Sequence, residues 1–118
     1  MEPNREHMRL WVEALRSGRY EQTTGRLRGE TGYCCLGVAC DISGLADWAE
    51  AGSDEYPWSY GGAEEILPDG VAEWLGVEDV SPMVFWELRD TQEELASLND
   101  EGRTFAEIAD AIEKEWLA

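Results

Sequence analysis

The first pattern along the chain is a stripe of apolar residues at helical spacing within residues 5–17. Its members are Met8, Trp11, Val12 and Leu15. They return to one face because an α-helix turns once every 3.6 residues. Asn4 is placed to cap the first turn and Gly18 to end the last one, so the sequence predicts an amphipathic helix here.

A second apolar stretch, residues 34–42, has almost no polar position. Its small residues allow neighbouring backbone to approach closely, and Gly44 follows as a stop signal. We predict a buried helix that ends at Gly44. Periodicity alone leaves a buried strand as the alternative.

Start and stop signals predict three more helices in the second half of the chain. Pro68 opens the first of them and Gly76 ends it. The patterns Thr91-x-x-Glu94 and Thr104-x-x-Glu107 both match a capping box. The former predicts a short helix through Leu95 and Leu98, before a turn at residues 99–102. The latter predicts a final helix with the apolar stripe Phe105, Ile108, Ala109, Ile112 and Trp116.

Three segments lack helical periodicity. Residues 19–33 combine extended-favouring residues with a glycine-rich turn, which predicts a short β-hairpin. Residues 83–86 are typical of a short strand. Residues 45–65 are irregular, and within them Asp54–Gly62 is predicted to be an exposed loop whose aromatic residues either pack on the core or bind a ligand.

These elements together predict an α+β fold of about five helices with a small antiparallel sheet or hairpin. The 118 residues suit a single domain spanning 1–118, and 43% of them are hydrophobic, which is enough for a core. No stretch approaches the length of a membrane span, and the N-terminus shows no signal-peptide pattern, so we expect an intracellular protein that does not bind membranes.

Three cysteines, Cys34, Cys35 and Cys40, fall within one apolar segment. An odd number so close together does not resemble a secreted disulfide framework, and we interpret them as small buried residues. The alternative is a zinc site, which would need a fourth ligand, and the single histidine, His7, is distant in sequence. We therefore expect no metal and no cofactor.

The charge is divided unevenly along the chain. The net charge is −17, yet residues 1–28 hold six arginines against four glutamates, a net of +2. The remaining 90 residues hold three basic and 22 acidic side chains, a net of −19. Such a field repels nucleic acid and anionic membrane, so direct DNA binding is disfavoured.

Residues from this basic N-terminal part form the one candidate binding site in the sequence. They are Arg16, Arg19, Tyr20, Gln22, Thr23, Arg26 and Arg28. Guanidinium groups bind phosphate through two parallel hydrogen bonds, which suggests a small phosphorylated or nucleotide ligand. The alternative is that these arginines pair with the protein's own carboxylates.

Catalytic motifs give no comparable signal. The chain has no phosphate-binding glycine loop with its lysine, no G-x-S-x-G elbow and no H-E-x-x-H. A cysteine–histidine pair would have to join His7 to one of the three thiols. We identify no catalytic residue and favour a protein without enzymatic activity, while an enzyme of unfamiliar type stays open.

Two blocks of sequence resemble a family of small proteins encoded by tailed phages and prophages. The first block is Trp11-Val12-x-Ala14-Leu15-Arg16-Ser17-Gly18-x-Tyr20-x-Gln22 with Gly25-x-Leu27-Arg28 and Tyr33-Cys34-Cys35-Leu36-Gly37-Val38-Ala39-Cys40. The second is Leu95-Ala96-x-Leu98-Asn99-Asp100-x-Gly102-x-x-Phe105-x-x-Ile108-Ala109. The resemblance implies an accessory gene of a mobile element, expressed in the bacterial cytoplasm. It supplies no catalytic or binding residue.

Three functional hypotheses follow. The leading one is an accessory binding protein that inhibits a host function such as a defence system, with its acidic surface occupying the nucleic-acid-binding site of a host protein. The second is sequestration of a small phosphorylated or nucleotide ligand by the arginine-rich site. The third is an enzyme with no recognisable motif.

Overall fold

Helix α1 spans Arg5–Arg16 and begins where the sequence predicts. The computed structural model describes residues 2–118. The Asn4 side chain accepts a hydrogen bond from the His7 backbone N–H at 3.0 Å, which satisfies one of the unpaired donors of the first turn. The Trp11 indole Nε1–H donates to the Cys35 carbonyl at 2.9 Å and ties the buried face of α1 to the next helix.

Helix α2, Cys35–Ser43, is the buried helix that the sequence predicts. The Cys34 sulfur accepts from the Gly37 backbone N–H at its start, and Gly44 ends it in the left-handed conformation with φ +64°. Gly37 is where other backbone comes closest. A Cβ on this residue would lie 1.8 Å from the Leu27 carbonyl oxygen. The expected close approach is therefore confirmed.

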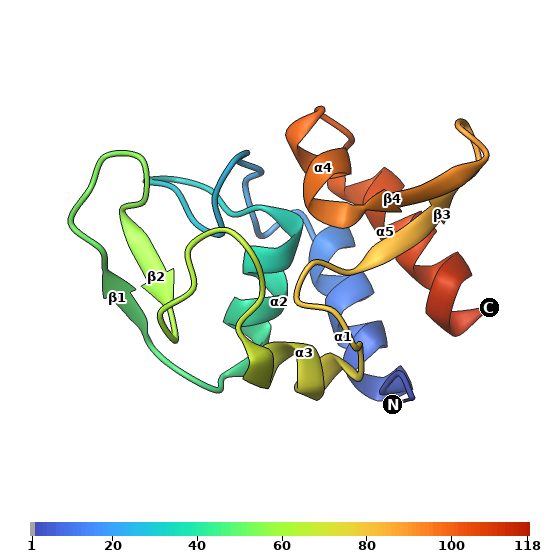
Figure 1. Cartoon of the computed structure of the whole chain (residues 1–118), viewed down its shortest axis with the longest axis horizontal. Coiled ribbons are helices and arrows are strands. Elements are labelled where there is room, and N and C mark those ends of the chain that lie inside the picture. Colours follow the sequence, from blue (N-terminus) through green and yellow to red (C-terminus); the bar gives the residue numbers. More distant parts are fainter. Residues whose placement is uncertain (1) are drawn as a thin grey trace.

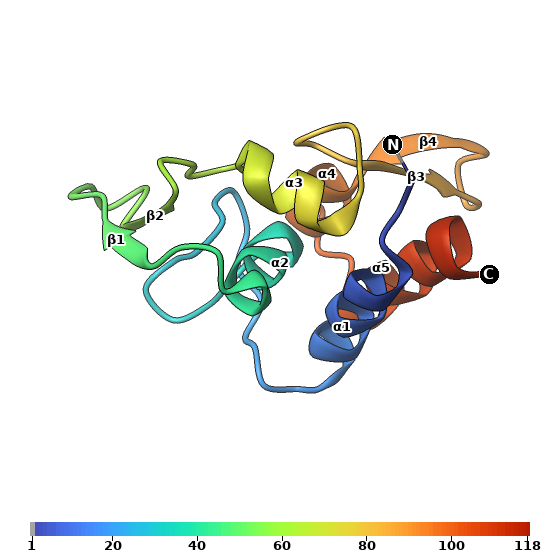
Figure 2. The ribbon, with the colours of Figure 1, turned by 90° about the horizontal axis from the view of Figure 1, so that it is seen from below.

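Three more helices follow. They are α3 (Asp69–Leu75), α4 (Leu95–Asp100) and α5 (Phe105–Ile112), and α5 continues into a π-helical turn over Glu113–Leu117. Gly76 ends α3 with φ +78°, as predicted. Helices α1 and α5 lie side by side, and α2 packs on the other side of α1 (Figures 1 and 2).

The strands form two separate antiparallel hairpins. Strands β1 (Trp48–Glu50) and β2 (Trp58–Tyr60) pair with each other, as do β3 (Met83–Trp86) and β4 (Thr91–Glu94). The two hairpins lie at opposite ends of a molecule whose principal extents are 39 × 27 × 24 Å (Figures 1 and 2). The helices and their shared core lie between them.

Two predictions of regular structure are wrong. Residues 19–33 form no hairpin, because Gln22 and Arg28 each make only an isolated bridge to Tyr33. Residues 45–65, predicted to be irregular with an exposed loop over Asp54–Gly62, contain the β1–β2 hairpin, and strand β2 lies inside the predicted loop.

The first predicted capping box is also wrong. Thr91–Glu94 forms strand β4 because its backbone pairs with Met83–Trp86 across a tight turn. Helix α4 starts only after it and has no side-chain cap. The second box is confirmed, because Thr104 and Glu107 exchange both side-chain hydrogen bonds at the start of α5.

Over residues 2–118, five α-helices and two two-stranded antiparallel sheets confirm the predicted α+β class. One cluster of buried residues runs through all five helices and includes Val84 and Trp86 of β3. Within residues 2–118, no helix has both the length and the hydropathy that crossing a membrane requires.

Candidate functional site

The seven predicted site residues do not share one surface. Arg16, at the end of α1, pairs with Asp110 at 2.6 Å and with Glu113 at 3.3 Å, both in the C-terminal helical segment. Hydrogen bonds to Glu113 and Asp110 raise the Arg16 pKa. For this arginine, the alternative prediction of pairing with the protein's own carboxylates is confirmed.

Gln22 and Thr23 bind Asn99, a fully buried side chain at the end of α4. The Asn99 carboxamide oxygen accepts from Gln22 Nε2 at 2.9 Å and from the Cys35 backbone N–H at 3.2 Å. Its nitrogen donates to the Thr23 carbonyl at 2.7 Å. These contacts anchor residues 22–23 to helices α2 and α4. Gln22 Nε2 also donates to the Arg103 carbonyl, so the donors of this side chain are used within the protein.

Arg28 lies among aromatic rings at the side of the β1–β2 hairpin. Its guanidinium carbon is 4.2 Å from the ring centre of Trp58, 5.2 Å from that of Tyr33 and 5.4 Å from that of Trp48. Such distances are those of cation–π contacts. The aromatic residues of the hairpin thus pack against the rest of the protein, which is one of the two alternatives predicted for this segment.

Tyr20 lies beside this cluster and donates its hydroxyl to Asp41 at 2.6 Å. The Tyr20 pKa is raised, mainly because the side chain is partly buried and secondly because of this hydrogen bond. Arg19 is exposed, and its guanidinium carbon is 5.8 Å from the Tyr20 ring centre. The Arg26 side chain has neither a hydrogen bond nor an ion pair within residues 2–118, and its Nε is buried without an acceptor.

The histidine and the thiols are not arranged for catalysis. His7 stacks on Trp74 with ring centres 4.0 Å apart, and its Nδ1 lies 2.6 Å from the Trp74 carbonyl oxygen. All three cysteines are buried. Burial raises the pKa of all three thiols, that of Cys34 to about 11, so the thiols stay protonated and unreactive. Residues 2–118 contain no group of His, Cys, Asp and Glu side chains that could hold a metal ion.

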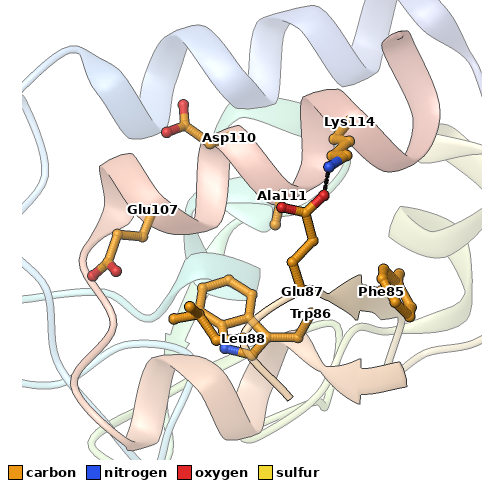
Figure 3. A pocket seen from close by; sticks show the side chains of 8 residues that line it. All are labelled: Phe85, Trp86, Glu87, Leu88, Glu107, Asp110, Ala111 and Lys114. Atoms are coloured by element: carbon orange, nitrogen blue, oxygen red, sulfur yellow. Dashed lines mark ion pairs between the residues drawn. The ribbon is translucent and has the colours of Figure 1, made fainter. Parts of the chain in front are cut away.

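A hollow of about 260 Å³ lies between the β3–β4 hairpin and helix α5 (Figure 3). Its walls are Phe85, Trp86, Glu87, Leu88, Glu107, Asp110, Ala111 and Lys114. We call it the hairpin groove. Glu87 reaches across it and forms an ion pair with Lys114, with Phe85 on one side of this bridge and Trp86 and Leu88 on the other (Figure 3).

The hairpin groove is bordered by an exposed apolar surface. Among large apolar side chains, Leu88 is 74% exposed, and Phe85 and Met83 are 42% and 41% exposed. These three account for half of the six exposed large hydrophobic residues in the described chain. Met83 and Phe85 alternate with the buried residues of β3, so one face of this strand stays apolar and in contact with solvent.

Carboxylates edge the same groove. Its lining holds Glu87, Asp110 and Glu107, which are ion-paired with Lys114, Arg16 and Arg103 respectively. Arg89 at the hairpin pairs with Glu101 at 2.7 Å and with Glu93 at 3.2 Å. The groove is therefore apolar in the middle and edged by ion-paired carboxylates.

The open edge of β3 is covered. The Phe85 backbone N–H donates to the Glu115 carboxylate at 2.9 Å. A partner strand would have to displace this carboxylate to extend the sheet. Side-chain contact is therefore the available mode of binding at this surface.

The fold and the groove define a small α+β domain with an apolar, carboxylate-edged surface. The chain belongs to the family described as a domain of unknown function (DUF8296), which matches residues 4–116. No curated protein and no solved structure matches the chain.

Neither the groove nor the buried Asn99 was among the predicted site features. One signal was available for the groove. Residues 83–86 are all apolar, and an antiparallel pair of strands with no second sheet against it protects only one face. No local signal marks Asn99, because its partners are 64 to 77 residues away in the chain.

Proposed function

We propose that this protein is an accessory binding protein that inhibits a host function by binding a basic, nucleic-acid-binding host protein through the hairpin groove. The observation that carries the proposal is the exposed apolar face of β3 beside Leu88, bordered by carboxylates. Exposed apolar patches with polar rims are characteristic of protein-binding surfaces. The similarity to phage and prophage proteins supports the role of an accessory protein acting in a bacterial cytoplasm.

The negative net charge of the protein favours a partner with a basic surface. A chain of net charge −17 attracts basic surfaces from a distance and repels acidic ones. Nucleic-acid-binding proteins expose clusters of lysine and arginine, which would exchange with Lys114, Arg16 and Arg103 beside Glu87, Asp110 and Glu107 at the groove. Apolar contact at Leu88 and Phe85 then supplies affinity that is independent of salt.

The test is site-specific photo-crosslinking in a bacterial host. A photoreactive residue replaces Leu88 in one strain and Leu45, which is 53% exposed, in a matched strain. We expect position 88 to capture a defined basic nucleic-acid-binding protein that position 45 does not capture. Equal capture at both positions, or capture of acidic proteins, would contradict the proposal.

Binding to the purified partner then separates apolar from charged contributions. Burying each side chain contributes about 1.5 kcal/mol or more, so the double substitution Phe85→Ala, Leu88→Ser should weaken binding about 100-fold. Leu45→Ser is the matched control and should have no effect. Asp110→Asn should reduce the salt dependence of binding, whereas Glu30→Gln, at an exposed site outside the groove, should not.

A further inference from the structure

A second hollow lies at the start of β3, on the side of the C-terminal turn. Its volume is about 320 Å³, which equals that of roughly ten water molecules at about 30 Å³ each, so one large side chain fits inside. We call it the Met83 hollow. The N-terminal segment, the α3–β3 connection, β3 and the C-terminal turn supply its lining, which is Pro3, Gly76, Val77, Glu78, Asp79, Pro82, Met83 and Trp116.

The Met83 hollow and the hairpin groove share one strand and one helical segment. Met83 lines the hollow and Phe85 lines the groove, and these alternate residues of β3 both lie on its exposed face. Trp116 and Lys114, both from the π-helical turn, are divided between the two linings in the same way. Alternate residues of a strand are about 6.7 Å apart, so a single bound segment can reach both hollows.

The Met83 hollow combines exposed apolar surface with an unused hydrogen-bond donor. Met83 is 41% exposed, and Trp116 is partly buried against the core. The Trp116 indole N–H has no acceptor within residues 2–118 and is not buried, so it can donate to a backbone carbonyl of a partner. Tryptophans with an apolar body and an accessible N–H are enriched at protein interfaces.

The charge of the Met83 hollow differs from that of the hairpin groove, whose carboxylates are already ion-paired. Among residues 2–118, two carboxylates line the hollow, those of Glu78 and Asp79, and no cation does. Asp79 is exposed and makes no hydrogen bond or ion pair within this part of the chain. A lysine or arginine of a partner can therefore pair with Asp79 without displacing another cation.

We propose that the Met83 hollow is the second half of the partner-binding surface and accepts an apolar side chain with a lysine or arginine next to it. This inference rests on the proposed function, because the basic partner that covers Leu88 continues over Met83 into the hollow. The apolar side chain contacts Met83 and Trp116, and the neighbouring cation pairs with Asp79. A second copy of this chain does not fit this role, because two chains of net charge −17 repel each other.

Nuclear magnetic resonance titration of the isotope-labelled protein with three capped peptides of equal length tests the proposal. One peptide alternates lysine with leucine, one alternates glutamate with leucine, and one consists of lysine alone. We expect the lysine–leucine peptide to shift resonances in both regions, followed at Asp79, at the Trp116 indole and at Leu88. The other two peptides should bind at least tenfold more weakly, and equal binding by either would overturn the proposal.

The same titration separates this inference from the proposed function. Shifts confined to the hairpin groove would overturn the shared surface and leave the proposed function standing. The absence of shifts in the groove would contradict both.

Variants assign the binding to the Met83 hollow. Met83→Ser should weaken binding of the lysine–leucine peptide about fivefold, and Asp79→Asn should weaken it about threefold at low salt. Leu45→Ser and Asp54→Asn are the matched controls, at exposed sites near the β1–β2 hairpin, and should leave binding unchanged. Circular dichroism verifies that each variant is folded. If folded Met83→Ser and Asp79→Asn both bound the peptide as the unmodified chain does, the hollow would not belong to the binding surface.

Discussion

The substitution Gly37→Ala tests the closest contact in the core. Alanine at this position would place its Cβ 1.8 Å from the Leu27 carbonyl oxygen and 2.8 Å from the carbonyl carbon. Real Cβ contacts essentially never fall below 3.0 Å, so the Leu27 backbone would have to retreat by about 1.2 Å or α2 would have to shift.

Leu27 cannot retreat freely. Its carbonyl accepts from the Cys34 backbone N–H at 3.0 Å, its own N–H donates to the Glu64 carbonyl at 2.7 Å, and its side chain is fully buried. Overpacking costs about 1–3 kcal/mol, and one broken buried hydrogen bond costs a similar amount. The better helix propensity of alanine offsets about 1 kcal/mol of this cost. We therefore expect the free energy of unfolding to fall by about 3 kcal/mol.

The assay is urea unfolding followed by tryptophan fluorescence and circular dichroism. With a dependence of the unfolding free energy on urea of about 1.5 kcal/mol/M, the urea concentration at the unfolding midpoint should fall by about 2 M. Gly70→Ala is the control, because this helical glycine has open space where a Cβ would go and no left-handed φ. It should raise stability by about 0.5 kcal/mol. A Gly37→Ala midpoint at or above that of the unmodified chain would refute the reasoning.

Three further predictions concern the core and its caps. Asn99→Ala should lower the free energy of unfolding by about 2–4 kcal/mol in urea titrations, because it strands the buried Cys35 N–H and removes both bonds that hold residues 22–23. Thr104→Ala should cost about 1 kcal/mol by removing the cap of α5, whereas Thr91→Ala should cost less than about 0.5 kcal/mol, because Thr91 caps no helix. The raised pKa of Cys34, about 11 against 9.0, favours the folded state fully below pH 9. Stability from this thiol should be lost as the pH rises from 9 to 11, and Cys34→Ala should reduce that loss in unfolding measurements across this range.

The helices could be predicted largely because their ends depend on neighbouring residues. Asn4 accepts from a backbone N–H three residues on, and Gly44 and Gly76 adopt left-handed backbone conformations that other residues seldom adopt. Each signal is complete within one or two turns of chain. The fold class follows from the number and type of such elements.

The strands could not be placed from local signals, because their partners decide them. Thr91–Glu94 fits a capping box in isolation, but pairing with Met83–Trp86 supplies backbone hydrogen bonds that a new helix start would forgo. Residues 19–33 have the composition of a hairpin. Gln22 and Thr23 instead bind Asn99, which lies more than 70 residues further along the chain. The Thr23 backbone N–H donates to the Tyr33 carbonyl.

The arginine-rich site shows the same limit. The sequence places Arg16, Arg26 and Arg28 within 13 residues. The fold determines which of their guanidinium groups lies beside a hydrogen-bond acceptor. Arg16 meets the carboxylates of the C-terminal helical segment, and Arg28 meets the aromatic rings of the hairpin. Arg26 meets neither, and its buried Nε–H has no acceptor within residues 2–118. The seven predicted residues therefore do not converge on one ligand site.

Solubility gives the strongest argument that the hairpin groove has a function. In a chain with 26 acidic residues, charged side chains at the exposed positions of β3 would keep that strand soluble and discourage association. The protein instead places Met83 and Phe85 there and adds Leu88 at the hairpin turn, where 74% of the leucine is exposed. The same strand already sends Val84 and Trp86 into the core, so these three side chains add solvent-exposed apolar surface beside it. The proposed partner would cover this surface and so remove the cost of exposing it to water.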